Sequence, residues 1–122
     1  MERKSDVMEL TIIAKYRAVV IKPDEELDES NAVQIRCEAD KLIKKTGIKN
    51  VVFDMRRVTF MDSSGIGVIM GRYRTVCTLG GSVAIFGMSQ NIKRIIEMSG
   101  IGDLVLITDK MHEALEEVAK IC

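Results

Sequence analysis

The sequence predicts an α/β domain whose sheet is mixed and mostly parallel, with an antiparallel edge and about four helices. Two short runs of branched apolar residues open the chain, close enough in sequence to pair directly. After them, segments with apolar residues at helical spacing alternate with short apolar runs, and the chain closes on a helical segment. A helix between two strands returns the chain to the starting end of the sheet, so this alternation predicts parallel strands.

The antiparallel edge is predicted from residues 8–14 and 17–21. These runs are rich in Ile, Val and Leu, and only Lys15 and Tyr16 separate them. Such a short connection favours two adjacent antiparallel strands. The polar stretch 23–29 then ends the strand pattern and is interpreted as a connection.

Four helices are predicted, each bounded by residues that start or stop a helix. Asp and Ser are good N-cap residues, and glycine commonly follows the last turn. Strands are predicted at 51–53, 83–86 and 104–107, with a short apolar step at 58–61. The helical segments are residues 30–45 before Gly47, the run from Asp62 and Ser63 to Gly80 and Gly81, the run from Ser89 to Gly100, and the segment after Asp109.

Apolar residues three and four apart predict the helix faces that meet the sheet. Methionine is a flexible filler of core gaps, so the methionines on these faces are expected to be buried. The expected buried positions are Ala32, Ile35, Ala39, Leu42 and Ile43 in the first helix, Ile66, Ile69, Met70, Tyr73, Val76 and Cys77 in the second, Met111, Ala114, Leu115, Val118 and Ala119 in the fourth, and the methionines 61, 70, 98 and 111.

Composition restricts the function classes. The 122 residues, 47% hydrophobic and 30% charged, match one domain spanning 1–122. Eighteen basic residues balance eighteen acidic ones and aromatic residues make up 4%, which disfavours nucleic acid and anionic membranes as partners. The cysteines Cys37, Cys77 and Cys122 are far apart and predict reduced thiols in a cytoplasmic protein with no metal site. No apolar run approaches the ~18 residues of a spanning helix.

A glycine-rich segment from Phe60 to Tyr73 is the most unusual part of the chain. It places Gly65, Gly67 and Gly71 at or inside the second helix, where each interior glycine costs roughly 0.5–1 kcal/mol relative to alanine. Close packing of the helix against the sheet would offset this cost. Exposure of the helix start to a partner is the functional alternative, and spacing alone does not choose between them.

Two adjacent hydroxyls, Ser63 and Ser64, stand at the start of this helix. They could cap it, because a serine oxygen satisfies backbone N–H groups that lack partners in the first turn. Phosphorylation is the second possibility, because a phosphoryl group there would meet free N–H donors and the positive end of the helix dipole. The added charge would weaken docking of a partner and leave the domain folded.

Enzymatic interpretations have less support. A serine nucleophile at Ser63 or Ser64 would depend on His112, the only histidine, and the Gly-x-Ser-x-Gly pattern is absent. The glycine spacing differs from the dinucleotide fingerprint, and no Walker A lysine follows it. Asp54, followed by Arg56 and Arg57, is interpreted as a solvated turn rather than a phosphate site. No cofactor is predicted.

Around the sequence Phe60-Met61-Asp62-Ser63-Ser64-Gly65, the chain resembles the STAS family, specifically the sporulation-type anti-sigma factor antagonists. The resemblance runs from Val51 through Gly81 and resumes at residues 93–100. It implies a single STAS domain without catalytic activity, monomeric, that binds an anti-sigma factor serine kinase and so frees a sigma factor. It further implies that the kinase phosphorylates Ser63, which releases the kinase, and that a serine phosphatase resets the cycle.

The resemblance also implies a docking surface around Ser63. By position it would comprise Asp28, Asp62, Ser63, Ser64, Gly65 and Gly67. Glu25 stands where the family usually has glycine, a change that bears on the shape of the loop before the first helix. Two alternatives remain: a STAS interaction module of another pathway, such as general stress or a scaffold, and a small serine hydrolase.

Overall fold

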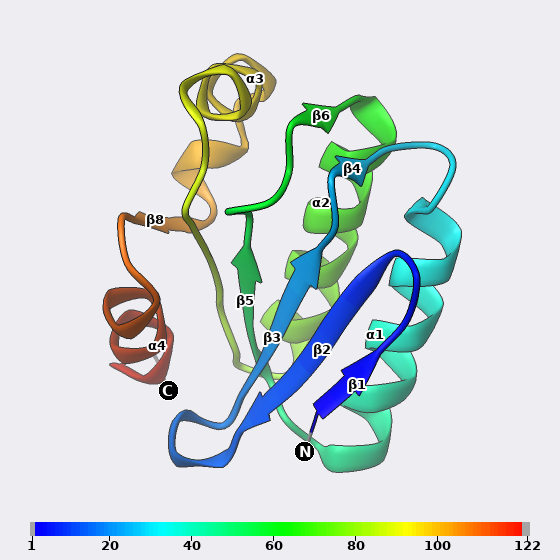
Figure 1. The fold of residues 1–122 in the computed structure, drawn as a ribbon. Helices are drawn as coiled ribbons and strands as arrows, with labels where there is room; N and C mark the ends of the chain where they lie inside the picture. The colour runs from blue at the N-terminus through cyan, green and yellow to red at the C-terminus, as the bar shows by residue number, and fades with distance from the viewer. Residues whose placement is uncertain (1, 121–122) are drawn as a thin grey trace.

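The computed structural model describes residues 2–120 and places a mixed sheet at the centre of the molecule (Figure 1). Its described strands follow the order β1-β2-β3-β5-β7-β8. The first three pair antiparallel and the last four pair parallel, which confirms the predicted fold class. The strands are β1 (Glu2–Lys4), β2 (Met8–Ile13), β3 (Ala18–Pro23), β5 (Asn50–Asp54), β7 (Val83–Phe86) and β8 (Leu106–Thr108).

The predicted hairpin is confirmed. β2 and β3 pair from Met8 opposite Pro23 to Ile13 opposite Ala18. A single 3-10 turn connects them, and Arg17 follows it in the left-handed conformation with φ of 51°. The three-residue strand β1 pairs with β2 and extends this edge, which the sequence pattern did not predict.

The helices cover both faces of the sheet. α1 and α2 pack side by side on one face, and α4 packs on the other against β3, β5, β7 and β8 (Figure 1). α3 lies beyond the carboxyl end of β7. The predicted caps at Asp62, Ser89 and Gly100 are confirmed. The helices are α1 (Ala32–Thr46), α2 (Ser63–Thr78), α3 (Gln90–Ser99) and α4 (Met111–Lys120).

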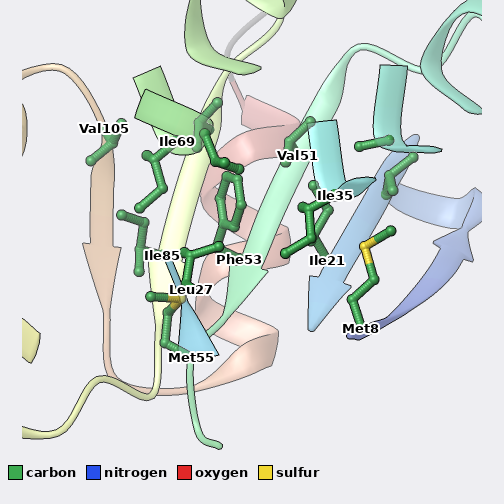
Figure 2. Packing of buried hydrophobic residues seen from close by; sticks show 14 of the residues in the cluster. Met8, Ile21, Leu27, Ile35, Val51, Phe53, Met55, Ile69, Ile85 and Val105 are labelled. Carbon is green, nitrogen blue, oxygen red and sulfur yellow. The ribbon is translucent and has the colours of Figure 1, made fainter. Parts of the chain in front are cut away.

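Alternation along the strands divides the buried residues into two clusters. The larger cluster lies between the sheet and α1 and α2, where Ile21, Phe53 and Ile85 from neighbouring strands meet Ile35 and Ile69 from the helices (Figure 2). The smaller cluster, on the opposite face, joins Val20, Val52, Ala84 and Phe86 to Ala114, Leu115 and Val118 of α4. Because successive side chains of a strand point to opposite faces, the sheet separates α2 from α4.

A second, two-stranded sheet lies beyond the carboxyl end of β3. β4 (Glu26–Leu27) pairs parallel with β6 (Phe60–Met61), and the backbone N–H groups of Thr59 and Phe60 donate to the Glu25 carbonyl at 2.8 and 3.2 Å. Leu27 is fully buried. The interpretation of 23–29 as a polar connection was therefore wrong for Glu26 and Leu27, because these residues form a strand that pairs with β6, 34 positions later in the sequence.

Several predicted core positions need correction. The buried face of α2 is formed by Gly65, Val68, Ile69, Arg72 and Val76, so Cys77 is exposed and Ile66, Met70 and Tyr73 are half-buried. Met98 is 81% exposed because it lies on the outer side of α3. Ala119 of α4 is exposed as well. The last strand begins at Leu106 rather than 104, because a 3-10 turn over Ile101–Asp103 delays it.

No helix within residues 2–120 is long and apolar enough to cross a membrane. The same range contains no cluster of side chains suited to a metal ion. Cys37 and Cys77 are free and exposed, whereas Cys122 lies outside the described residues.

Candidate functional site

Asp62 caps the second helix with its carboxylate. Its Oδ1 accepts hydrogen bonds from the backbone N–H of Ser64 at 2.8 Å and of Gly65 at 3.3 Å. The first turn of a helix leaves its N–H groups without partners inside the helix, and an aspartate at this position satisfies them. The cap therefore fixes the backbone on either side of Ser63.

The same carboxylate reaches the loop before α1. Its Oδ2 accepts from the backbone N–H of Glu29 at 3.3 Å, across 33 positions of sequence. Asp28 accepts from the backbone N–H of Ser30 at 3.0 Å, and the buried Asn31 donates to the Glu26 carbonyl at 2.7 Å. These bonds hold residues 26–31 beside the start of α2.

The predicted site residues occupy different positions around this cap. Ser63 is exposed at the first helical position, Gly67 is exposed one turn later, and Ser64 is half-buried. Asp28 is half-buried in the adjacent loop. Gly65 is buried beneath β4, so a direct contact between Gly65 and a partner does not fit the structure.

The glycines of α2 divide into two kinds. A Cβ on Gly65 would overlap the Leu27 carbonyl oxygen and lie 2.6 Å from Met61 Cγ, so only glycine fits there. A Cβ on Gly67 or Gly71 would meet no other atom within 4 Å. The close-packing explanation therefore holds for Gly65 alone, and the open surface at Gly67 and Gly71 favours exposure to a partner.

A groove of about 220 Å³ runs beside Ser63 between the first turns of α1 and α2. Val33, 62% exposed, and Arg36 line it from α1, and Ser64, Gly67 and Val68 line it from α2. Sequence reasoning missed Val33 and Arg36, because only the tertiary fold brings them to α2. The signal available was an apolar Val33 on the outer side of the predicted first helix.

The surface around Ser63 is acidic. Glu25, Glu26 and Glu29 are exposed in the segment before α1, and the backbone N–H of Glu29 donates to the Asp62 carboxylate next to Ser63. Within residues 2–120, the ion pairs of the structure involve other carboxylates. These carboxylates oppose an additional negative charge at Ser63, and the Arg36 side chain that lines the groove is the nearby positive charge.

An ion pair between a buried arginine and a partly exposed aspartate connects α1 and α2. Arg72 of α2 is 3% exposed, and its Nε lies 2.9 Å from Oδ1 of Asp40 of α1. Burial lowers the pKa of the Arg72 guanidinium, and the Asp40 carboxylate opposes that effect. The pair links the two helices whose first turns form the groove.

The serine hydrolase alternative does not fit this geometry. His112 is exposed on α4, on the opposite face of the sheet from Ser63 and Ser64.

The carboxylate of Asp54, at the end of β5, is buried and accepts two hydrogen bonds from the Arg56 guanidinium at 2.9 and 2.7 Å. The interpretation of this segment as a turn is confirmed, but its description as solvated was wrong for Asp54, because the Asp54 carboxylate is 1% exposed and bound by Arg56.

Comparison with known proteins agrees with this arrangement. The family model described as the STAS domain matches residues 9–117. An anti-sigma F factor antagonist from Paenibacillus polymyxa is 31% identical over 100 residues, which cover 82% of this chain and 86% of the relative.

Solved structures are similar over nearly the whole chain. The anti-sigma factor antagonist SpoIIAA in its unphosphorylated form has a TM-score of 0.74 at 26% identity, covering 93% of this chain and 99% of the other. The Bacillus cell fate determinant SpoIIAA in its phosphorylated form has a TM-score of 0.70 at 27% identity, covering 91% and 98%. The chain belongs to the STAS domain family, and anti-sigma factor antagonists of the SpoIIAA type are its relatives there.

Proposed function

We propose that this chain is an anti-sigma factor antagonist, a cytoplasmic single domain of residues 1–122 that acts as a monomer without catalysis of its own. It binds an anti-sigma factor serine kinase and so releases a sigma factor. The kinase phosphorylates Ser63, the phosphorylated form releases the kinase, and a serine phosphatase restores the active form.

The observation that carries this proposal is the position of Ser63. Its side chain is exposed at the first position of a helix whose backbone is fixed by Asp62, beside a groove between two helices. A kinase can reach such a hydroxyl without unfolding the domain. The relative solved in a phosphorylated form supports modification of this fold.

Charge explains how phosphorylation would act. A phosphoserine carries about −1.5 to −2 charges near pH 7, and here it would stand among Asp28, Glu29 and Asp62. The dipole at the start of α2 offsets part of that repulsion within the domain. At an interface with a docked partner the added charge must also be desolvated, so binding weakens while the fold persists.

The direct test uses the anti-sigma factor kinase of the same organism. With ATP, we expect one phosphoryl group on the parent chain, none on Ser63→Ala, and one on the matched variant Ser64→Ala. Ser63→Asp should bind the kinase at least about tenfold more weakly than the parent, because a charge at an interface is costly. Phosphorylation of Ser64, or parent-like binding by Ser63→Asp, would contradict the mechanism.

Mass spectrometry of the chain recovered from its own cells tests the pathway. The expected result is a phosphopeptide containing Ser63 and an ATP-binding kinase that co-purifies. An unmodified chain bound to a different protein would instead assign this STAS domain to another pathway, such as general stress or a scaffold.

A further inference from the structure

The two outer strands of the central sheet differ in their protection. β1, at one edge, carries charged residues including Glu2 and Lys4, and charge is a common device against pairing with another chain. β8, at the other edge, has the sequence Leu106-Ile107-Thr108 and no charge within the strand. An edge strand leaves half of its backbone N–H and C=O groups without partners in the sheet.

Apolar side chains are exposed along this open edge. Ile107 is 37% exposed and Leu104, just before the strand, is 47% exposed. Leu106 packs toward the α4 cluster, so Ile107, the next residue, points to the opposite face of the sheet. β8 thus presents apolar surface on the face away from α4 as well as unpaired backbone groups.

A recess of about 470 Å³ follows the same strand. Glu113 and Glu117 of α4 line it on the Leu106 side, and Lys93 of α3 lines it together with Ile107. Asp109 lines it as well, so the lining holds three carboxylates and one ammonium group, before the pairing of Glu117 with Lys120 is counted. Glu117 also pairs with Lys120 at 3.0 Å, and Glu113 accepts from the backbone N–H of Lys110 at 3.2 Å.

This charge distribution disfavours a second copy of the chain as the occupant. Two identical strands that pair antiparallel are related by an axis perpendicular to the sheet, so both α4 helices would lie on the same face. Glu113 and Glu117 of one copy would then approach those of the other, and like charges across an interface oppose association.

We propose that β8 is a docking edge for an extended segment of another protein, with basic residues alternating with apolar ones. Such a segment adds a strand to the sheet through main-chain hydrogen bonds. Because its side chains alternate in direction, the basic ones lie beside Glu113 and Glu117, and the apolar ones lie beside Ile107. This edge is separate from the Ser63 surface, and the inference does not depend on the proposed switch.

The test uses synthetic peptides and the isotope-labelled full-length chain in NMR titrations. The probe is an acetylated and amidated peptide of sequence Lys-Val-Lys-Val-Lys-Val-Lys. We expect it to shift the backbone amide signals of residues 104–109. Its Glu-Val counterpart and a block peptide with all lysines first should bind at least about tenfold more weakly.

Two controls separate strand pairing from simple charge attraction. Methylation of every backbone nitrogen in the probe keeps its charge and removes its main-chain donors, so it should abolish the shifts. The double variant Glu113→Gln and Glu117→Gln should weaken binding about tenfold, whereas the exposed pair Glu97→Gln and Asp6→Asn should leave it unchanged.

Three results would overturn the proposal. The first is equal binding of the alternating, block and N-methylated peptides. The second is a set of shifts that lies away from 104–109. The third is concentration-dependent self-association of the chain through these same residues without peptide, which would assign the edge to a homodimer.

Discussion

The Asp62 carboxylate accepts a hydrogen bond from the backbone N–H of Glu29 at 3.3 Å while its other oxygen caps α2. One side chain thus fixes both the helix that begins at Ser63 and the loop that precedes α1. A change at either segment alters the surroundings of Ser63, although 33 positions separate the residues in sequence.

Replacing Asp62 should loosen both segments. We expect Asp62→Ala to lower the free energy of unfolding by about 1–2 kcal/mol, because the first-turn N–H groups lose their acceptor. Urea denaturation followed by circular dichroism measures the change. Asp6→Asn, an exposed acid outside the site, serves as the control, and an unaltered midpoint for Asp62→Ala would show that the cap is not stabilising.

The glycines of α2 should respond in opposite directions to alanine. Gly65→Ala forces a Cβ against Leu27 and Met61, and overpacking of this kind costs about 1–3 kcal/mol. Gly67→Ala adds a methyl group in open space and should raise stability by about 0.5–1 kcal/mol. The two variants form a matched pair for urea unfolding, and shifts of the same sign would refute the packing described here.

The stability of the domain should depend on Asp40 as long as the buried Arg72 is present, because Asp40 is the ion-pair partner of Arg72. Asp40→Asn leaves the guanidinium without its carboxylate and should lower stability by about 1–3 kcal/mol, less than for a fully buried pair because Asp40 is 41% exposed. Arg72→Met should change stability by less than about 1 kcal/mol, since an apolar side chain of similar size suits this position.

The double variant provides the control for this pair. In the Arg72→Met background, Asp40→Asn should have almost no further effect on the urea midpoint. An equal cost in both backgrounds would show that Asp40 stabilises α1 by some route other than Arg72.

A negative charge at Ser63 should be tolerated by the fold. Ser63→Asp places a carboxylate at the positive end of the α2 dipole, where a gain of about 0.3–1 kcal/mol opposes the repulsion from Asp62 and Glu29. Its thermal midpoint should therefore stay close to that of the parent. Thr78→Asp, at the other end of the same helix, should have a lower thermal midpoint than the parent. A lower midpoint for Ser63→Asp than for Thr78→Asp would show that the α2 dipole does not favour a negative charge at Ser63.

Local patterns were sufficient to predict much of this fold. Helix caps at Asp62 and Ser89 and the strand 83–86 depend on neighbouring residues, and the structure confirms them. Ser63 could be singled out for the same reason, because a hydroxyl beside a cap is visible within a few positions of sequence.

Features that depend on distant contacts could not be predicted in this way. Leu27 is buried only because β6 pairs with it, and Val33 lines one groove with Ser64 only through the packing of α1 on α2. Arg72 was missed because a charged residue is usually exposed, and its partner Asp40 lies on another helix. The open edge at β8 likewise follows from strand order, which no single segment encodes.

The glycine-rich start of α2 restricts what an enzyme could recognise there. Gly65, Gly67 and Gly71 give this stretch little intrinsic tendency to form a helix, and its first turn is held by Asp62 together with a loop from elsewhere in the chain. A short peptide spanning Ser63 would lack that support. An enzyme that modifies Ser63 in this geometry must recognise the folded domain and not a linear peptide. Incorporation of phosphate would therefore report whether the domain is natively folded.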